Sequence, residues 1–334
     1  MTIRWGIIGC GDVARRRVAN AVITNPNSEL VAVCRRDEAK LRQFCDEFEI
    51  TRSYTDADQL ICDPELDAVY VATPVNLHLP QTIAAARAGK HVLVEKPMAM
   101  TVGECDEMID VCRRQNVKLG VAYYRRYYPV VEHIKQLIES GEIGDVLSVS
   151  VATAAAFAMT PEDDGYWRVI PEQGGGGALM DIGSHRINLL LYLFGNIADV
   201  RCFAGTVAAD YESEDSASLV MQFHNGIHGS LQCFFGCPVD PDEFTVIGTK
   251  GRLRSAPLNG GSLTIELSAQ TRNELHPPNE NFNVPLIADF VEAIENDREP
   301  LVSGEDGRDV NVVMARAYDE CASRRRSESP SLRS

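Results

Sequence analysis

The first 120 residues alternate short apolar runs with longer segments in which apolar residues recur at helical spacing. The apolar runs predict strands at 3–9, 29–34, 67–73, 91–94 and 118–122. The segments between them predict helices at 37–48, 80–88 and 102–115, after a first helix that ends near residue 22. Strands that alternate with helices form βαβ units with right-handed crossovers. We therefore expect residues 1–122 to form an α/β domain with a doubly wound parallel sheet.

The pattern changes after this point. One helix is predicted at 129–140, and β-rich runs then follow one another without regular helices between them, at 146–155, 198–208, 216–223, 226–235 and 244–248. His224-Asn225-Gly226 is a hairpin signal between two of these runs. Consecutive strands joined by turns favour an antiparallel sheet. Residues 123–322 are therefore predicted as an α+β domain with further helices at 181–194, 286–296 and 305–321, and the polar residues 323–334 as a frayed tail.

Composition narrows the class of protein. The 334 residues carry a net charge of -16, which repels phosphate backbones and argues against nucleic-acid binding. No run approaches the ~18 apolar residues of a membrane helix, and no secretory signal begins the sequence, so we expect a cytoplasmic protein without a membrane partner. The ten cysteines are expected to be reduced, and because no CxxC spacing occurs we predict no structural zinc or other metal site.

A glycine-rich turn follows the first predicted strand. Gly9, Gly11, Asp12 and Val13, followed by Ala14, fit the pattern G-x-G-x-x-G/A. In this pattern the first glycine makes the turn, the second admits a pyrophosphate, and the helix N-terminus faces the negative charge. The alternative is a plain tight turn, but the βαβ context favours a dinucleotide site.

The end of the second predicted strand bears on the choice of cofactor. An acidic residue there would bind a ribose hydroxyl and favour NAD. This chain instead has Arg35 and Arg36, with Lys40 one turn later, and guanidinium groups suit a 2′-phosphate. We predict a preference for NADP(H), with NAD(H) as the alternative because Asp37 could serve a ribose and the arginines could be surface charge.

Two further predicted strand ends carry polar residues. Thr73, Pro74, Asn76 and His78 follow the strand at 67–73, where they are predicted to line the cofactor, or else to form an ordinary turn with an asparagine cap. Glu95 and Lys96 follow the strand at 91–94 and are predicted to lie in the same crevice. A lysine beside a nicotinamide can hydrogen-bond a substrate oxygen and favour a developing alkoxide. The alternative is a salt bridge between Lys96 and Glu95.

Asp181 and His185 are four residues apart, which places them on one helix face after the glycine run 174–177. Histidine is the usual proton donor or acceptor near neutral pH, and Asp181 could orient it. The alternative is a capped helix with a core histidine. The adjacent Trp167 and Arg168 favour a functional role for this stretch. The residues predicted to contact substrate are Lys96, Tyr123, Arg168, Asp181, His185 and Asn188. Tyr123 begins an aromatic and arginine-rich run, 123–128, that is predicted as the domain hinge. Tyr123 or Arg126 could line the cleft, and a packing role is the alternative for each.

These stretches together resemble the Gfo/Idh/MocA family of glucose–fructose oxidoreductases and inositol dehydrogenases. The resemblance rests on the glycine loop, on 73–78, on 89–97, on 175–185 and on Ser303-Gly304-Glu305-Asp306-Gly307. It implies a Rossmann domain followed by a domain with an open, mostly antiparallel sheet, whose exposed face forms a homodimer or homotetramer interface. It also implies that Lys96 is the catalytic lysine, that Asp181 and His185 are the proton-transfer pair, and that Trp167-Arg168 covers the nicotinamide as in some NADP-linked sugar reductases.

The combined interpretation is an NADP(H)-linked dehydrogenase or reductase that acts on a sugar, a sugar derivative or a polyol. Arg35 differs from the acidic residue of NAD-dependent inositol dehydrogenases, which argues against inositol as the substrate. Two alternatives remain open: a glycosidase or lyase that uses transient oxidation by a tightly held NAD, and a non-catalytic regulator that senses the cofactor. The joint presence of Lys96 and His185 argues against the regulator.

Overall fold

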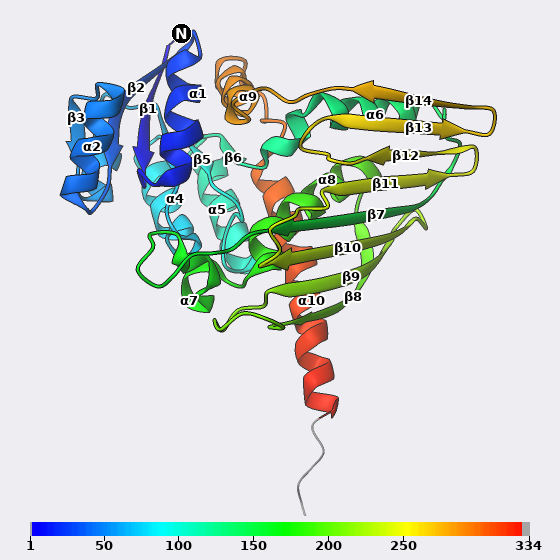
Figure 1. The fold of residues 1–334 in the computed structure, drawn as a ribbon. Helices are drawn as coiled ribbons and strands as arrows, with labels where there is room; N and C mark the ends of the chain where they lie inside the picture. Colours follow the sequence, from blue (N-terminus) through cyan, green and yellow to red (C-terminus); the bar gives the residue numbers. More distant parts are fainter. Residues whose placement is uncertain (1, 329–334) are drawn as a thin grey trace, which may run out of the picture. The chain divides into compact units, whose positions relative to one another are not determined.

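The computed structural model describes residues 2–328 and contains two compact units (Figure 1). Among the described residues, unit 1 comprises 2–127 and 279–308, and unit 2 comprises 128–278 and 309–328. The hydrophobic pattern grouped 279–308 with the second domain, but in the structure these residues pack with unit 1. Within residues 2–328 we find no helix long and apolar enough to cross a membrane.

The sheet of unit 1 is parallel, with the strand order β3-β2-β1-β4-β5-β6, which confirms the predicted doubly wound architecture. Its strands are β1 (Ile3–Ile8), β2 (Ser28–Cys34), β3 (Arg52–Tyr54), β4 (Ala68–Val71), β5 (His91–Val94) and β6 (Leu119–Val121). The order reverses between β1 and β4, and the carboxyl ends of strands at such a point form the usual ligand crevice of this class of sheet. β3 was not predicted because it is short and largely polar.

The helices of unit 1 follow the strands in βαβ order. They are η1 (Ala14–Val18), α1 (Ala19–Thr24), α2 (Glu38–Phe48), α3 (Ala57–Ile61), η2 (Val75–Leu77), α4 (His78–Arg87), α5 (Val102–Arg114) and η3 (Tyr124–Tyr127), joined by α9 (Asn283–Glu295). Helix α9 packs against β1 and β6, since the Phe290 ring lies 5.6 Å from the Trp5 ring and a Cβ atom on Gly120 would come within 2.9 Å of Phe290. These contacts explain why 279–308 belongs with unit 1.

The sheet of unit 2 has the order β14-β13-β12-β11-β7-β10-β9-β8. Its strands are β7 (Val146–Ala155), β8 (Ile197–Gly205), β9 (Ser216–Phe223), β10 (His228–Phe235), β11 (Glu243–Gly248), β12 (Gly251–Ser255), β13 (Ser262–Leu267) and β14 (Gln270–Leu275). The pair β7–β10 is parallel and the other neighbouring pairs are antiparallel, which confirms a mostly antiparallel sheet.

One face of this sheet is covered by helices (Figure 1). The helices of unit 2 are α6 (Pro129–Glu139), η4 (Tyr166–Val169), α7 (Pro171–Gly174), η5 (Leu179–Gly183), α8 (Ser184–Phe194) and most of α10 (Gly304–Glu328). Alternate residues of the strands point toward them, such as Leu219 and Met221 on β9, and are buried. Helix α10 continues through 323–328, part of the segment predicted as a frayed tail, and residues 329–334 lie outside the described part of the chain.

Candidate active site

The glycine loop lies at the carboxyl end of β1. Gly9 has φ +93°, and a Cβ atom there would lie 2.6 Å from the carbonyl oxygen of Ala72, so only glycine fits this turn. A Cβ atom on Gly11 would meet nothing within 4 Å, which leaves the backbone open to a ligand. Helical structure starts directly after the loop, and the exposed Asp12 pairs with Arg16 at 2.7 Å. The loop therefore has the cradle that a dinucleotide pyrophosphate needs.

Arg35 is joined to this loop, whereas Arg36 and Lys40 are exposed. The Arg35 guanidinium donates to the carbonyl oxygen of Cys10. The Asp37 carboxylate accepts a 3.0 Å hydrogen bond from the backbone N–H of Lys40, which caps α2 and holds the pKa of that carboxyl below its ordinary value. A guanidinium beside the loop places positive charge where the ribose end of a dinucleotide would lie.

His78 connects two loops at the carboxyl edge of the sheet. Its Nε2 atom lies 2.9 Å from the Thr73 carbonyl oxygen, and its Nδ1 atom lies 3.1 Å from that of Pro97 and 3.2 Å from that of Met98. The side chain is fully buried, and burial lowers its pKa to about 4, although the three carbonyls favour the protonated form. His78 therefore positions the predicted cofactor loop through the backbone, next to the exposed Asn76.

Lys96 follows β5 and is partly exposed. Its neighbour Glu95 accepts a 2.7 Å hydrogen bond from the Tyr70 hydroxyl at one oxygen and a 3.2 Å bond from the Lys96 backbone N–H at the other. Asn283 of α9 donates in turn to the Tyr70 hydroxyl at 3.3 Å. The Glu95 carboxylate is thus held by β4 and α9, which fixes the backbone that presents Lys96.

Positive charge gathers around Tyr124 in the same unit. The Arg17 guanidinium lies 5.3 Å from the Tyr124 ring and 4.9 Å from that of Phe282, and Arg125 lies 5.0 Å from Tyr124. Burial favours a higher pKa for the Tyr124 hydroxyl, but the charges of Arg125, Arg17 and Lys96 outweigh it and lower this pKa. Arg17 and Phe282 were not predicted as part of this group, because they lie far apart along the chain.

Residues 123–127 of the predicted hinge run belong to unit 1, and unit 2 begins at Tyr128, so the boundary between the units falls within the run. Tyr123 is fully buried. Arg126 is buried as well, forming an ion pair with Asp306 at 2.8 Å and donating to the Leu301 carbonyl at 3.1 Å. Arg126 therefore has the packing role rather than the cleft-lining role that was the other reading of this residue.

A second polar group forms in unit 2, around the π-helical turn η5. The Arg168 guanidinium stacks 4.5 Å from the Trp167 ring, and its Nε atom lies 3.8 Å from the Asp181 carboxylate. Both charged side chains are about one-fifth exposed, at 22% and 21%. The structure thus brings together the predicted Trp167, Arg168 and Asp181. Single π-helical turns inside helices are frequent at functional sites.

Helix α8 carries the remaining predicted residues of unit 2. His185 and Asn188 lie three residues apart, and both are buried, with exposed fractions of 5% and 1%. The next residue after His185, Arg186, forms a buried ion pair with Asp242 in the turn before β11. This pair fastens the helix to the sheet and thereby fixes the position of His185.

A buried carboxylate, Glu214, holds the glycine run that leads into η5. It accepts hydrogen bonds of 2.9 Å from the N–H groups of Gly177 and Leu179, and one of 2.8 Å from the Tyr318 hydroxyl. A Cβ atom on Gly177 would lie 1.9 Å from the Glu214 carbonyl oxygen, so the run needs glycine there. Burial raises the pKa of Glu214. The hollow of about 520 Å³ beside these residues is not lined by Asp181 or His185.

Comparison with known proteins agrees with the fold described above. Residues 3–123 match the model of the "Oxidoreductase family, NAD-binding Rossmann fold", and residues 131–254 match the "GFO/IDH/MocA C-terminal domain". The chain is 31% identical to 1,5-anhydro-D-fructose reductase of Ensifer adhaerens, over 91% of this chain and 92% of that protein. It is 30% identical to dTDP-3,4-didehydro-2,6-dideoxy-alpha-D-glucose 3-reductase of Streptomyces antibioticus, over 87% of this chain and 88% of that protein.

A solved structure is similar over nearly the whole chain. It is that of the aldose-aldose oxidoreductase from Caulobacter crescentus, complexed with glycerol, with a TM-score of 0.88 and 29% identity over 97% of this chain and 98% of that chain.

Proposed function

Because the chain belongs to the Gfo/Idh/MocA family of oxidoreductases, we propose that it transfers a hydride between a nicotinamide cofactor and a hydroxyl-bearing carbon of a sugar, a sugar derivative or a polyol. The observation that carries this proposal is the glycine loop at the point where the strand order reverses, with Gly11 open to a ligand. The substrate class follows from the relatives, which include two named sugar reductases and an aldose-aldose oxidoreductase.

The cofactor proposed is NADP(H), with NAD(H) as the weaker ligand. Gly9, Gly11 and Val13 would hold the pyrophosphate, and Arg35 with Arg36 and Lys40 would hold the 2′-phosphate. The hydrogen bond from Arg35 to the Cys10 carbonyl oxygen supports this assignment, because it holds the guanidinium beside the glycine loop. Thr73, Pro74, Asn76 and Glu95 would line the rest of the cofactor, with Trp167 and Arg168. When bound, the nicotinamide ring supplies the hydride acceptor or donor.

We assign Lys96 the role of stabilising charge on the substrate oxygen. Its ammonium would donate a hydrogen bond to that oxygen in the alkoxide form. The guanidinium groups of Arg17 and Arg125 support this role, because together with Lys96 they lower the pKa of Tyr124 and would favour an oxyanion in the same way.

We assign His185 the role of proton acceptor in the oxidation direction, taking the proton of the substrate hydroxyl. Asp181 would contact the substrate next to it, and its ion pair with Arg168 supports this by fixing the orientation of the carboxylate. Asn188 completes the proposed substrate contacts, whereas Tyr123 is fully buried and is assigned the packing role. The buried position of Asn188 beside His185 on α8 supports a shared task.

The test is a screen of aldoses, ketoses, polyols and anhydro-sugars with NADP(H) and with NAD(H), following the absorbance of the reduced nicotinamide. We expect stoichiometric change of nicotinamide with at least one sugar-like compound, and a lower KM for NADP(H). Consumption of a glycoside with no net change in nicotinamide would replace this proposal by the glycosidase or lyase alternative. Binding of cofactor with no turnover across the screen would favour the regulator.

We further propose that the chain forms a homodimer or homotetramer through the outer face of the unit 2 sheet. Phe203, Val220 and Ile247 are 66%, 62% and 43% exposed on strands β8, β9 and β11, and a group of exposed apolar side chains on one sheet supports an interaction surface there. The F203E/V220E variant is expected to shift the mass measured by light scattering to that of a monomer. An unchanged oligomer would move the interface elsewhere.

A further inference from the structure

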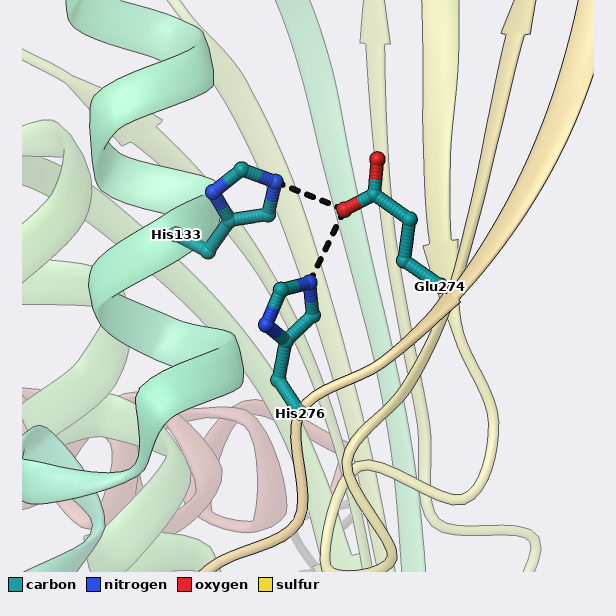
Figure 2. Close-up of side chains that lie close together, drawn as sticks. All are labelled: His133, Glu274 and His276. Atoms are coloured by element: carbon teal, nitrogen blue, oxygen red, sulfur yellow. Dashed lines mark hydrogen bonds and ion pairs between the residues drawn. The ribbon is translucent and has the colours of Figure 1, made fainter.

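Two histidines and a glutamate converge at the edge of the unit 2 sheet (Figure 2). His133 lies on α6, Glu274 lies on the edge strand β14, and His276 follows that strand directly. The Nε2 atoms of both histidines lie 2.8 Å from the same carboxylate oxygen, Oε2 of Glu274. The two imidazole rings are 4.5 Å apart, and the three ligand-type atoms all lie within 4.8 Å of one another.

One imidazole nitrogen of this cluster lacks a hydrogen bond. The Nε2 atom of His133 is shielded from solvent and forms no hydrogen bond, although it lies 2.8 Å from Oε2 of Glu274. A cation between the three side chains would take up the lone pair of that nitrogen.

The charges around the cluster suit a divalent cation. The Glu274 carboxylate supplies a negative charge between the two imidazoles. Arg272 binds the other carboxylate oxygen, Oε1, at 2.8 Å, and its own charge is offset by Glu142 at 2.6 Å. An outer partner that holds a ligating carboxylate in this way is a common feature of metal sites.

The ligand types indicate which metal. Two imidazoles with one carboxylate are a set that Zn²⁺ accepts, with a fourth position left for water. Tetrahedral ligands about 2.0 Å from zinc lie roughly 3.3 Å from one another, so modest side-chain rotation would complete the site. The side chains of His133, Glu274 and His276 are between 26% and 30% exposed, which gives an ion a path from solvent.

We propose that His133, Glu274 and His276 bind one Zn²⁺ ion, which fastens the edge strand β14 to helix α6. β14 pairs with β13 and ends the sheet, so its outer edge is exposed to pairing with other chains. The Arg272–Glu142 ion pair already ties the strand to the turn after α6. The ion adds a second and stronger link at the same end of the sheet.

The experiment is a titration of ZnCl₂ into the full chain after treatment with EDTA and removal of the chelator, followed by calorimetry and by thermal unfolding. The wild type is expected to bind one ion per chain at this site and to gain Tm on binding. The variants H133A, H276A and E274Q are expected to weaken this binding at least about 100-fold and to lose the gain in Tm. E274Q keeps the shape of the side chain, and its Tm without metal reports whether it folds.

The matched control is H224A/H228A, which removes two exposed histidines from the same unit and should keep wild-type binding. Co²⁺ is used in parallel as a spectroscopic probe, because the chain has ten cysteines that could bind metal. A cobalt spectrum without thiolate charge-transfer bands, lost in H133A, supports the site. No binding by the wild type, equal binding by H133A, H276A and E274Q, or thiolate bands would overturn it.

Discussion

The two units hold their candidate site residues by opposite electrostatic means. In unit 1 the anchor is His78, a buried imidazole that stays neutral between three carbonyl oxygens and joins the loops after β4 and β5. In unit 2 the anchor is Glu214, a buried carboxylate that accepts from two backbone N–H groups and from Tyr318. Burial therefore disfavours the protonated form of His78 in unit 1, whereas in unit 2 it disfavours the charged form of Glu214, which hydrogen bonds offset.

The largest effect on turnover is expected from substitution of Lys96 in unit 1. K96M removes the ammonium proposed to stabilise charge on the substrate oxygen, and should lower kcat by about 10²–10³-fold. Cofactor affinity, measured by fluorescence titration, should stay near that of the wild type. The exposed Lys250 provides a control, and K250M should leave kcat unchanged. Turnover of K96M close to the wild-type value would remove Lys96 from the mechanism.

In unit 2 the corresponding prediction concerns the buried carboxylate of Glu214. E214A leaves the N–H groups of Gly177 and Leu179 and the Tyr318 hydroxyl without their acceptor, and should lower the free energy of unfolding by about 3 kcal/mol. Urea unfolding followed by Trp167 fluorescence measures this. E212A, at an exposed neighbour, should change stability by less than about 0.5 kcal/mol. A small effect of E214A would show that the glycine run is held by other contacts.

Acidification should act on the two anchors with opposite sign. His78 has its folded pKa lowered to about 4 from 6.5, so the unfolded chain binds the proton first and stability falls as pH drops through this window. The loss is roughly 3 kcal/mol between pH 6.5 and 4. Glu214 has its folded pKa raised above 4.5, so its contribution falls as pH rises from 4.5 through the folded pKa.

The measurement for His78 uses the chain's two tryptophans. In a W167F background the remaining Trp5, buried in β1, reports on unit 1. Unfolding of this protein and of its H78N variant is followed in urea between pH 7 and 4. The free energy of unfolding should fall between pH 6.5 and pH 4 in the protein with His78, and it should fall less steeply in H78N. Equal slopes would assign the acid sensitivity to other groups.

A smaller effect is expected at Arg35. R35A removes one guanidinium from the proposed 2′-phosphate site and should raise the KM for NADP(H) about 10-fold, with little change for NAD(H). The variant R36A, at the exposed neighbouring arginine, distinguishes the contributions of the two side chains to the KM for NADP(H). If R35A affects both cofactors equally, Arg35 acts on the loop through Cys10 and does not choose the cofactor.

Local patterns predicted much of the fold and part of the candidate site. The glycine loop, the strand end at Lys96 and the helix with Asp181 and His185 are each contiguous, so their signals could be found in the sequence. Glu214 could not be found, because its partners lie 37 and 104 residues away. The same holds for the three residues of the proposed zinc site.

The missed strands have a related cause. β12 to β14 were not predicted, because they carry charged residues whose partners lie elsewhere in the folded chain. Arg252 pairs with Glu266 on β13, and Arg272 pairs with Glu142 after α6. The two members of such an ion pair come together only when the chain folds, so local sequence patterns do not predict them.

The central claim is that Lys96 of unit 1 and His185 of unit 2 serve the same reaction. The most direct test compares kcat for K96M, H185N and the double variant on a substrate found in the screen. Groups that act as a unit are strongly non-additive, so the double variant should be about as slow as the slower single variant. Losses that multiply, or near-normal turnover by either single variant, would contradict the account.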